Sequence, residues 1–308
     1  MHPRHWPQQP RKPNKKNIHY LLDEFSAADI KKWGDAKDLL LRYHWEFYSN
    51  LAFQRSRISD EIKQSLLEAA AKNYTITRWQ RIVKHKFSVE PLSVKGSLSD
   101  PGGRFNIGEI NPNQYQIFPA LYIASNKETA LQEALSQHIL PGKEEEALNS
   151  ALTNTVSTSN ISISGRIDSY IDLNSPERLK PFINLFKDFK IPKHVYEIAK
   201  YFKFPEPPTV ITTISKLMEA LLAPNWREWP MQYDVPVASQ IFGQLVMAAG
   251  IEGILYPSKF SKKNCLVIYP QNFDDTNGSL IQLDDPAPKE TKVLKWDHAT
   301  WKQFGTDL

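Results

Sequence analysis

The sequence predicts an α+β fold, in which a sheet and its surrounding helices follow a helical N-terminal extension. Three observations predict this class. Between residues 19 and 75, apolar side chains recur every three or four positions, as on one face of a helix. After Tyr74 the chain changes to short runs rich in β-branched and aromatic residues, separated by Gly and Pro. Strand-like and helix-like segments do not alternate regularly enough for a doubly wound parallel sheet.

The N-terminal quarter divides into an arm and the helical extension. Residues 1–18 are basic and rich in Pro, which predicts a disordered arm. A solvated tail is the simplest interpretation of this arm, and contact with nucleic acid is the alternative. In the extension, 19–75, Leu39, Tyr43 and Phe47 share a helical face, and Ser59 is a suitable N-cap for a second helix.

The expected catalytic domain, 76–275, begins with strands and a capped helix. Ser125 and Glu128 have the spacing of a capping box, so a helix should start there and end near Pro141. A polar stretch at 143–158 follows this helix. Strands are expected at 77–83, 120–124, 165–173, 253–256 and 265–269, with a tight loop at 99–108.

The second half of this domain contains the other helices. Amphipathic patterns at 176–223 predict two or three helices interrupted by prolines, and a Trp- and Pro-rich loop follows at 224–236. A helix is expected from Ala238 to Ala249, with Gly250 as its C-cap. Residues 276–308 are interpreted as a C-terminal tail.

Charge and composition exclude several classes of protein. The chain of 308 residues has a formal charge of +4, but five basic residues and no acid lie in the first nineteen positions. The remainder carries 33 basic and 34 acidic residues and is therefore close to neutral. A single cysteine, Cys265, excludes disulfides within the chain and thiolate zinc clusters. No apolar segment has the length of a membrane span or follows the pattern of a cleaved signal, so we expect a cytoplasmic protein.

Several common catalytic motifs are also absent from the sequence. It contains no phosphate loop, no GxGxxG, no HExxH and no GxSxG. The histidines are scattered without metal-ligand spacing, so we expect chemistry that needs no metal.

Polar residues instead gather at the ends of the predicted strands and loops. Gly102 and Gly103 precede Arg104, so the backbone can approach a ligand closely beside a fixed positive charge. Tyr122 lies in an otherwise apolar strand, and Glu133 lies on the helix after it. An arginine, an aromatic ring and a carboxylate suit a dinucleotide better than a metal ion. Each also has an ordinary structural explanation, as a turn arginine, a core tyrosine or a solvated helix residue.

The order of these motifs resembles the RES domain family, which is named for Arg, Glu and Ser. The matching segments are RI, GGRFN, ALYIASNKETALQE, a Trp-containing loop, and GILYPS followed by NCLVIY, which together span residues 78–269. The resemblance implies a fold like that of the ADP-ribosyltransferases, with a split β-sheet core. It also implies a bacterial toxin that consumes NAD by hydrolysis or phosphorolysis and is neutralised by an antitoxin with a helix-turn-helix domain.

The resemblance also implies roles for individual residues. Arg104, Tyr122 and Glu133 would be catalytic. The carboxylate of Glu133 can stabilise the ribosyl cation that remains when nicotinamide departs. The residues expected to bind NAD, which is the substrate, are Arg81, Gly102, Gly103, Asn106 and Ser258. The sequence departs from the family pattern by GGRFN in place of GGRWN and by an apparent insertion at 107–119.

Two other functions remain open at this stage. Some members of the family transfer ADP-ribose to a protein, which would make a macromolecule the acceptor. The other possibility is a binding module without catalysis, whose basic arm contacts nucleic acid.

Overall fold

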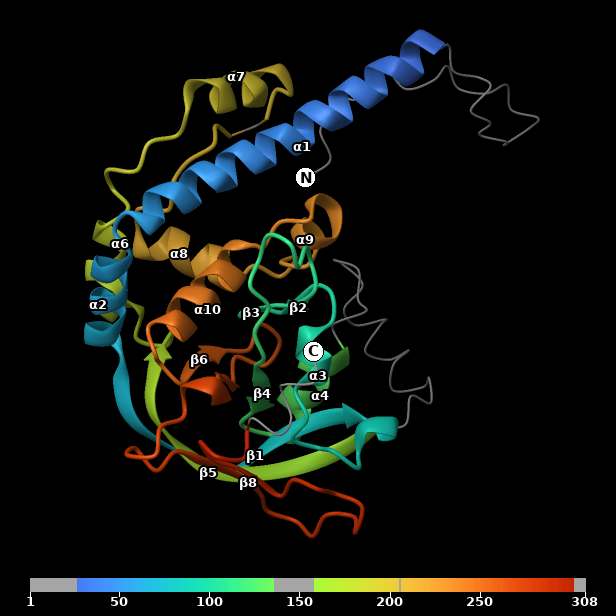
Figure 1. Ribbon diagram of the computed structural model, residues 1–308, viewed down its shortest axis with the longest axis vertical. Helices are drawn as coiled ribbons and strands as arrows, with labels where there is room; N and C mark the ends of the chain where they lie inside the picture. The colour runs from blue at the N-terminus through green and yellow to red at the C-terminus, as the bar shows by residue number, and fades with distance from the viewer. Residues whose placement is uncertain (1–26, 136–157, 205, 302–308) are drawn as a thin grey trace, which may run out of the picture. The chain divides into compact units, whose positions relative to one another are not determined.

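The computed structural model describes residues 27–135, 158–204 and 206–301, which form two compact units (Figure 1). The first unit comprises residues 1–59 and 186–211, and the second comprises 60–185 and 212–308. The predicted arm, the predicted helix end near Pro141 and most of the polar stretch at 143–158 lie outside the described residues. No helix in the described ranges has both the length and the apolar character needed to cross a membrane.

The first unit is helical, as the sequence predicts for the N-terminal extension. Helix α1 (Ala27–Ser56) packs against α7 (Lys193–Tyr201). The Gln54 side chain joins the two segments, because it donates to Lys190 O at 2.8 Å and accepts from Lys190 N at 2.9 Å. Tyr43 meets Phe204 edge to face, with 5.2 Å between ring centroids. Part of the stretch at 176–223, which was expected to belong to the catalytic domain, therefore packs with the N-terminal extension.

The extension gives way to a strand earlier than predicted. Helix α2 (Ser59–Ala69) starts at the residue predicted as its N-cap. Strand β1 (Ala71–Lys84) begins directly after Ala70, which follows the end of this helix. Residues 71–75 were expected to be helical, and this prediction is wrong. Tyr74 and Thr75 pair with Ile167 and Arg166 of strand β5 (Thr158–Asp172), and this long-range pairing outweighs the local helical periodicity.

Seven strands form the main sheet of the second unit. Their order is β1-β4-β7-β6-β5-β8-β9, and β1 also pairs with β5, so five strands close a ring. The long strands β1 and β5 curve side by side (Figure 1). The other strands are β4 (Leu121–Ala124), β6 (Gly253–Pro257), β7 (Asn264–Ile268), β8 (Leu280–Leu283) and β9 (Lys295–Trp296).

Helices surround this sheet, so the α+β class is confirmed. Helix α10 (Ala238–Ala248) ends with Ala249 as its C-cap, one residue before the predicted Gly250, which follows with a φ of 82°. The Trp- and Pro-rich loop contains a short helix, α9 (Glu228–Tyr233). The remaining helices are α3 (Lys95–Leu98), α4 (Lys127–Leu135), α6 (Lys180–Asn184) and α8 (Ile214–Leu221). Within the described residues, 3₁₀ turns lie at His85–Phe87, Pro176–Leu179 and Pro270–Asn272.

The segment interpreted as a C-terminal tail is part of the core. Strands β8 and β9 extend the sheet from β5, and Trp296 is completely buried. It joins one apolar cluster with Trp79, Ile123 and Leu255 from the ring strands. The sequence missed this because Ile281 and Trp296 are separated by Asp- and Pro-rich turns that obscure any periodicity.

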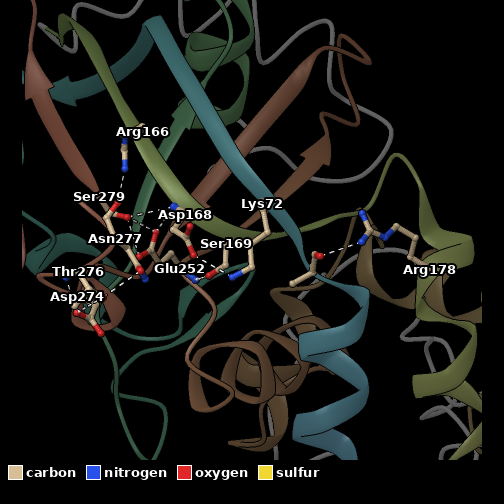
Figure 2. A network of polar contacts seen from close by, with 11 residues as sticks. Lys72, Arg166, Asp168, Ser169, Arg178, Glu252, Asp274, Thr276, Asn277 and Ser279 are labelled. Atoms are coloured by element: carbon tan, nitrogen blue, oxygen red, sulfur yellow. Dashed lines mark hydrogen bonds and ion pairs between the residues drawn. The ribbon is translucent and has the colours of Figure 1, made fainter.

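A buried carboxylate links three segments of the second unit (Figure 2). Glu252, next to β6, is 1% exposed. Its Oε2 accepts from Asp168 N at 2.6 Å, and both oxygens accept from the Ser279 hydroxyl at 2.8 and 2.7 Å. These bonds join β5, β6 and the segment before β8. Burial nevertheless raises the pKa of Glu252 above its ordinary value of 4.5, and the nearby Asp168 raises it further.

We expect Glu252 to make stability depend on pH. The folded protein keeps its proton where the unfolded chain has lost it, so this contribution is complete below about pH 4.5 and is lost as the pH rises through the raised pKa. Urea denaturation at several values between about pH 4 and pH 8 measures the effect. The free energy of unfolding should fall more steeply in the wild type than in Glu252→Gln. The exposed Glu219→Gln is the control, and equal slopes for Glu252→Gln and wild type would contradict this account.

Candidate functional site

A small hairpin carries the GGRFN motif and forms the centre of the candidate site. Strands β2 (Gly102–Gly103) and β3 (Asn106–Ile107) pair antiparallel, and Arg104 and Phe105 form the turn between them. Gly102 has a φ of 91°, which disfavours any residue with a side chain. A Cβ on Gly103 would lie 2.5 Å from Cζ of Tyr122. The two glycines therefore allow the turn and its contact with the tyrosine ring.

Asn106 and Tyr122 fasten this hairpin to the sheet. Asn106 Oδ1 accepts from Gly103 N and from the Tyr122 hydroxyl, both at 2.9 Å. The Tyr122 hydroxyl in turn accepts from Phe105 N at 2.9 Å. Asn106 Nδ2 donates to Ser97 O at 2.7 Å and to Phe118 O at 3.1 Å. Asn106 is fully buried, so in this structure it positions the backbone around Arg104.

Two further residues hold the hairpin backbone, and sequence reasoning missed both. Gln240 of α10 is fully buried, and its Nε2 lies within 3.2 Å of the carbonyl oxygens of Pro101, Gly103 and Asn106. Tyr269 donates to Phe105 O at 2.8 Å. Gln240 lies in a mostly apolar helix that also contains Gln244, so the sequence gives no clear signal that singles it out.

Arg104 projects from the turn into a mostly buried position. It is 9% exposed, and Nη1 donates to Ala223 O at 2.7 Å and to Leu221 O at 3.3 Å. Its Cζ also lies 5.9 Å from the ring centroid of Trp226. The arginine therefore connects the hairpin to the segment between α8 and α9.

Glu133 and Ser258, far apart in the sequence, meet directly. The buried Ser258 hydroxyl, just beyond β6, donates to Glu133 Oε1 at 2.6 Å. Thr129 and Ser261 make a second contact between the same segments, with 2.7 Å between their hydroxyl oxygens. The predicted cap of α4 is one residue out of place, because Asn126 rather than Ser125 accepts from Thr129 N at 2.9 Å.

The charged side chains of this region shift the pKa values of two buried groups, Tyr122 and Cys265. Burial raises the pKa of Tyr122, and the charges of Arg104 and Arg227 oppose this rise. Burial also raises the pKa of Cys265; the Glu133 charge raises it further, and the Arg104 charge lowers it. The charges of Arg104 and Glu133 therefore both act on the Cys265 thiol, which is buried as expected.

Arg227 is a further residue of this region that was not predicted from the sequence. Burial lowers its pKa to about 10, with Arg104 lowering it further and Tyr122, Glu133 and Tyr256 opposing the shift. It lies in the Trp- and Pro-rich loop, where only the tryptophans attracted notice.

Arg81 is the predicted site residue that the structure does not bring to this group. Its neighbour Gln80 pairs with Ala124 of β4, and Ala124 shares a face with Tyr122. Because successive residues of a strand point to opposite faces, Arg81 points away from Tyr122. Its Nη2 donates to Ser93 O at 2.7 Å, and its buried Nη1 finds no hydrogen-bond partner within the described ranges.

The arrangement brings two arginines, one carboxylate and several hydroxyl groups to the region between the hairpin, α4 and the end of β6. Such a set can bind an anion and stabilise a positive charge next to it. Among residues 27–135, 158–204 and 206–301, no three His, Cys, Asp or Glu side chains are grouped to hold a metal ion.

We expect Gly103→Ala to destabilise the protein by about 1–3 kcal/mol, because the new methyl group overlaps the Tyr122 ring. Thermal and urea denaturation measure this loss. Gly96→Ala is the matched control, since a Cβ there meets nothing within 4 Å. Equal stability of the two variants would show that Gly103 and Tyr122 are not in close contact.

The chain was compared with solved structures, curated proteins and models of protein families. Among solved structures, the chain is similar to a chain of the M. tuberculosis MbcT–MbcA toxin–antitoxin complex, with 14% identity and a TM-score of 0.41 over 79% of this chain and 96% of the other. No curated protein matches. The family model described as RES domain matches residues 78–291, a range that contains the hairpin, Tyr122, Glu133, Arg227 and Ser258. Since this match covers most of the sequence, the chain belongs to the RES domain family.

Proposed function

We propose that this protein consumes NAD by cleaving the bond between nicotinamide and ribose. The observation that carries the proposal is that the charges of Arg104 and Glu133 both act on buried Cys265 and Tyr256, while Ser258 is bonded to Glu133 at 2.6 Å. A cation beside a carboxylate fits a substrate that has an anionic diphosphate and develops a cationic ribosyl group during the reaction.

Each residue has a defined task in this proposal. Arg104 binds phosphate oxygens, and the hairpin fixes its backbone. Glu133 faces the ribose and stabilises positive charge on it, while the Ser258 hydroxyl orients the carboxylate. Tyr122 positions the hairpin through its hydroxyl group, and its ring is proposed to stack on nicotinamide. Gly102, Gly103 and Asn106 shape the turn.

The bond changes follow from the substrate. The glycosidic bond between ribosyl C1 and the pyridinium nitrogen breaks, and its electron pair leaves with neutral nicotinamide. The oxocarbenium-like ribosyl group that remains is the species that Glu133 stabilises. Water or inorganic phosphate then bonds to C1, with loss of a proton to solvent, and gives ADP-ribose or its phosphate ester.

The biological role follows from the family. We propose that the protein acts in the cytoplasm as the toxin of a toxin–antitoxin pair and depletes NAD. A helix-turn-helix antitoxin would be its partner. Induced expression in bacteria, with NAD measured in cell extracts, tests this role, because growth should stop as NAD falls. Growth arrest with unchanged NAD would contradict it.

We expect Glu133→Gln to lower the rate of nicotinamide release by about 100-fold or more, since it removes the charge that stabilises the ribosyl cation. Chromatography of nicotinamide formed from NAD measures the rate. Glu128→Gln is the matched control, because this glutamate lies on the same helix and is exposed. Unchanged release by Glu133→Gln would overturn the assignment.

The same assay with labelled NAD identifies the acceptor. Label in free ADP-ribose indicates water as the acceptor, and label in its phosphate ester indicates inorganic phosphate. Label bound to a protein would establish ADP-ribosyl transfer in place of hydrolysis or phosphorolysis.

A further inference from the structure

Two guanidinium groups share one buried tryptophan. Trp226 is 4% exposed and lies between α8 and α9. The Cζ atom of Arg227 lies 4.1 Å from its ring centroid, and that of Arg104 lies 5.9 Å from the same centroid. Cation–π attraction to one ring places both positive charges in the same part of the site.

Among the residues that the structure describes, neither arginine forms an ion pair. In the described part of the chain, no carboxylate oxygen lies within 4 Å of either guanidinium group. The Arg227 side chain makes no hydrogen bond there, and Arg104 donates only through Nη1. A guanidinium has five N–H donors, so most donors of this pair remain for a ligand.

The two charges also repel each other. Arg104 is among the causes that lower the pKa of Arg227 to about 10, after the larger effect of burial. Two like charges in a largely buried setting, with Glu133 near but no ion pair among the described residues, are unfavourable in the free protein. A bound anion that reaches both arginines removes this cost, and bidentate bonds to phosphate oxygens suit the planar guanidinium.

The backbone holds this pair in a fixed arrangement. Arg104 donates to Leu221 O and Ala223 O at the start of the segment that carries Trp226 and Arg227. Asn225 closes a turn over the same segment, since Glu228 N donates to Asn225 O at 3.0 Å and Asn225 Nδ2 donates to Glu228 Oε2 at 3.1 Å. The site is therefore built before any ligand arrives.

We propose that Arg227 and Arg104, with Trp226 as their shared platform, form the binding site for the diphosphate group of the dinucleotide. Arg227 thus takes the NAD-binding role that was expected of Arg81. That the diphosphate belongs to a dinucleotide rests on the proposed function, whereas binding of a diphosphate by these two arginines is independent of it.

Calorimetric titration with inorganic pyrophosphate and with ADP-ribose tests this site. Neither ligand carries a nicotinamide bond to cleave, so affinity is measured without turnover. Arg227→Gln should weaken both ligands by about 10- to 100-fold, as expected for loss of charge-assisted hydrogen bonds. Arg227→Met, which keeps an unbranched side chain to pack on Trp226, should show the same loss and serves as the second variant should Gln perturb the fold. The exposed Arg57→Gln is the control and should bind as the wild type does.

The outcomes separate this inference from the proposed function. Wild-type affinity in either folded Arg227 variant, or no binding of pyrophosphate and ADP-ribose to the wild type, overturns the site. Binding that depends on Arg227 in a protein that leaves NAD intact supports the site and removes the proposed function.

Discussion

The amide oxygen of Asn106 is the atom on which the candidate site depends. It accepts hydrogen bonds from Gly103 N–H and from the Tyr122 hydroxyl, so one atom joins the turn to the strand behind it. The amide nitrogen is equally committed, to Ser97 O and Phe118 O. Aspartate lacks these two donors and would bury a charge, so asparagine suits this position in a fully buried setting. These hydrogen bonds of Asn106 hold the turn that carries Arg104.

The second feature is an excess of positive charge in a partly buried site. Arg104 and Arg227 lie near one carboxylate, Glu133, and the described residues provide no ion pair for either arginine. Electrostatic interactions are stronger here than at the surface, because little water screens them. The formal charge of +4 is therefore a poor guide to function, since the first nineteen residues contribute +5 and the remainder of the chain contributes −1. The local pair of arginines is what favours an anionic substrate.

Local patterns predicted much of the fold and part of the site. Helix α10 and its end beside Gly250 were predicted to within one residue, because periodicity and cap chemistry are local. Arg104, Tyr122, Glu133 and Ser258 were identified through the order of their motifs, and the structure brings them together. Arg81 was assigned to the site because a motif does not show which face of a strand a residue occupies. That face depends on the register of β1 with β4, which is a long-range property.

Other features could not be found for related reasons. Arg227 acquires its role only when Trp226 and Arg104 meet across more than a hundred residues of sequence. Gln240 and Trp296 likewise matter through distant contacts, with the hairpin backbone and with the sheet core. The early start of β1 reflects pairing with β5, which no window of local sequence contains.

The most direct test of the account is a mass balance on purified protein and NAD. Nuclear magnetic resonance of the reaction mixture follows loss of NAD together with formation of nicotinamide and the ribosyl product. The account predicts one nicotinamide and one ADP-ribosyl product for each NAD consumed. NAD that remains intact, or that is cleaved at the diphosphate to give mononucleotides, would contradict it.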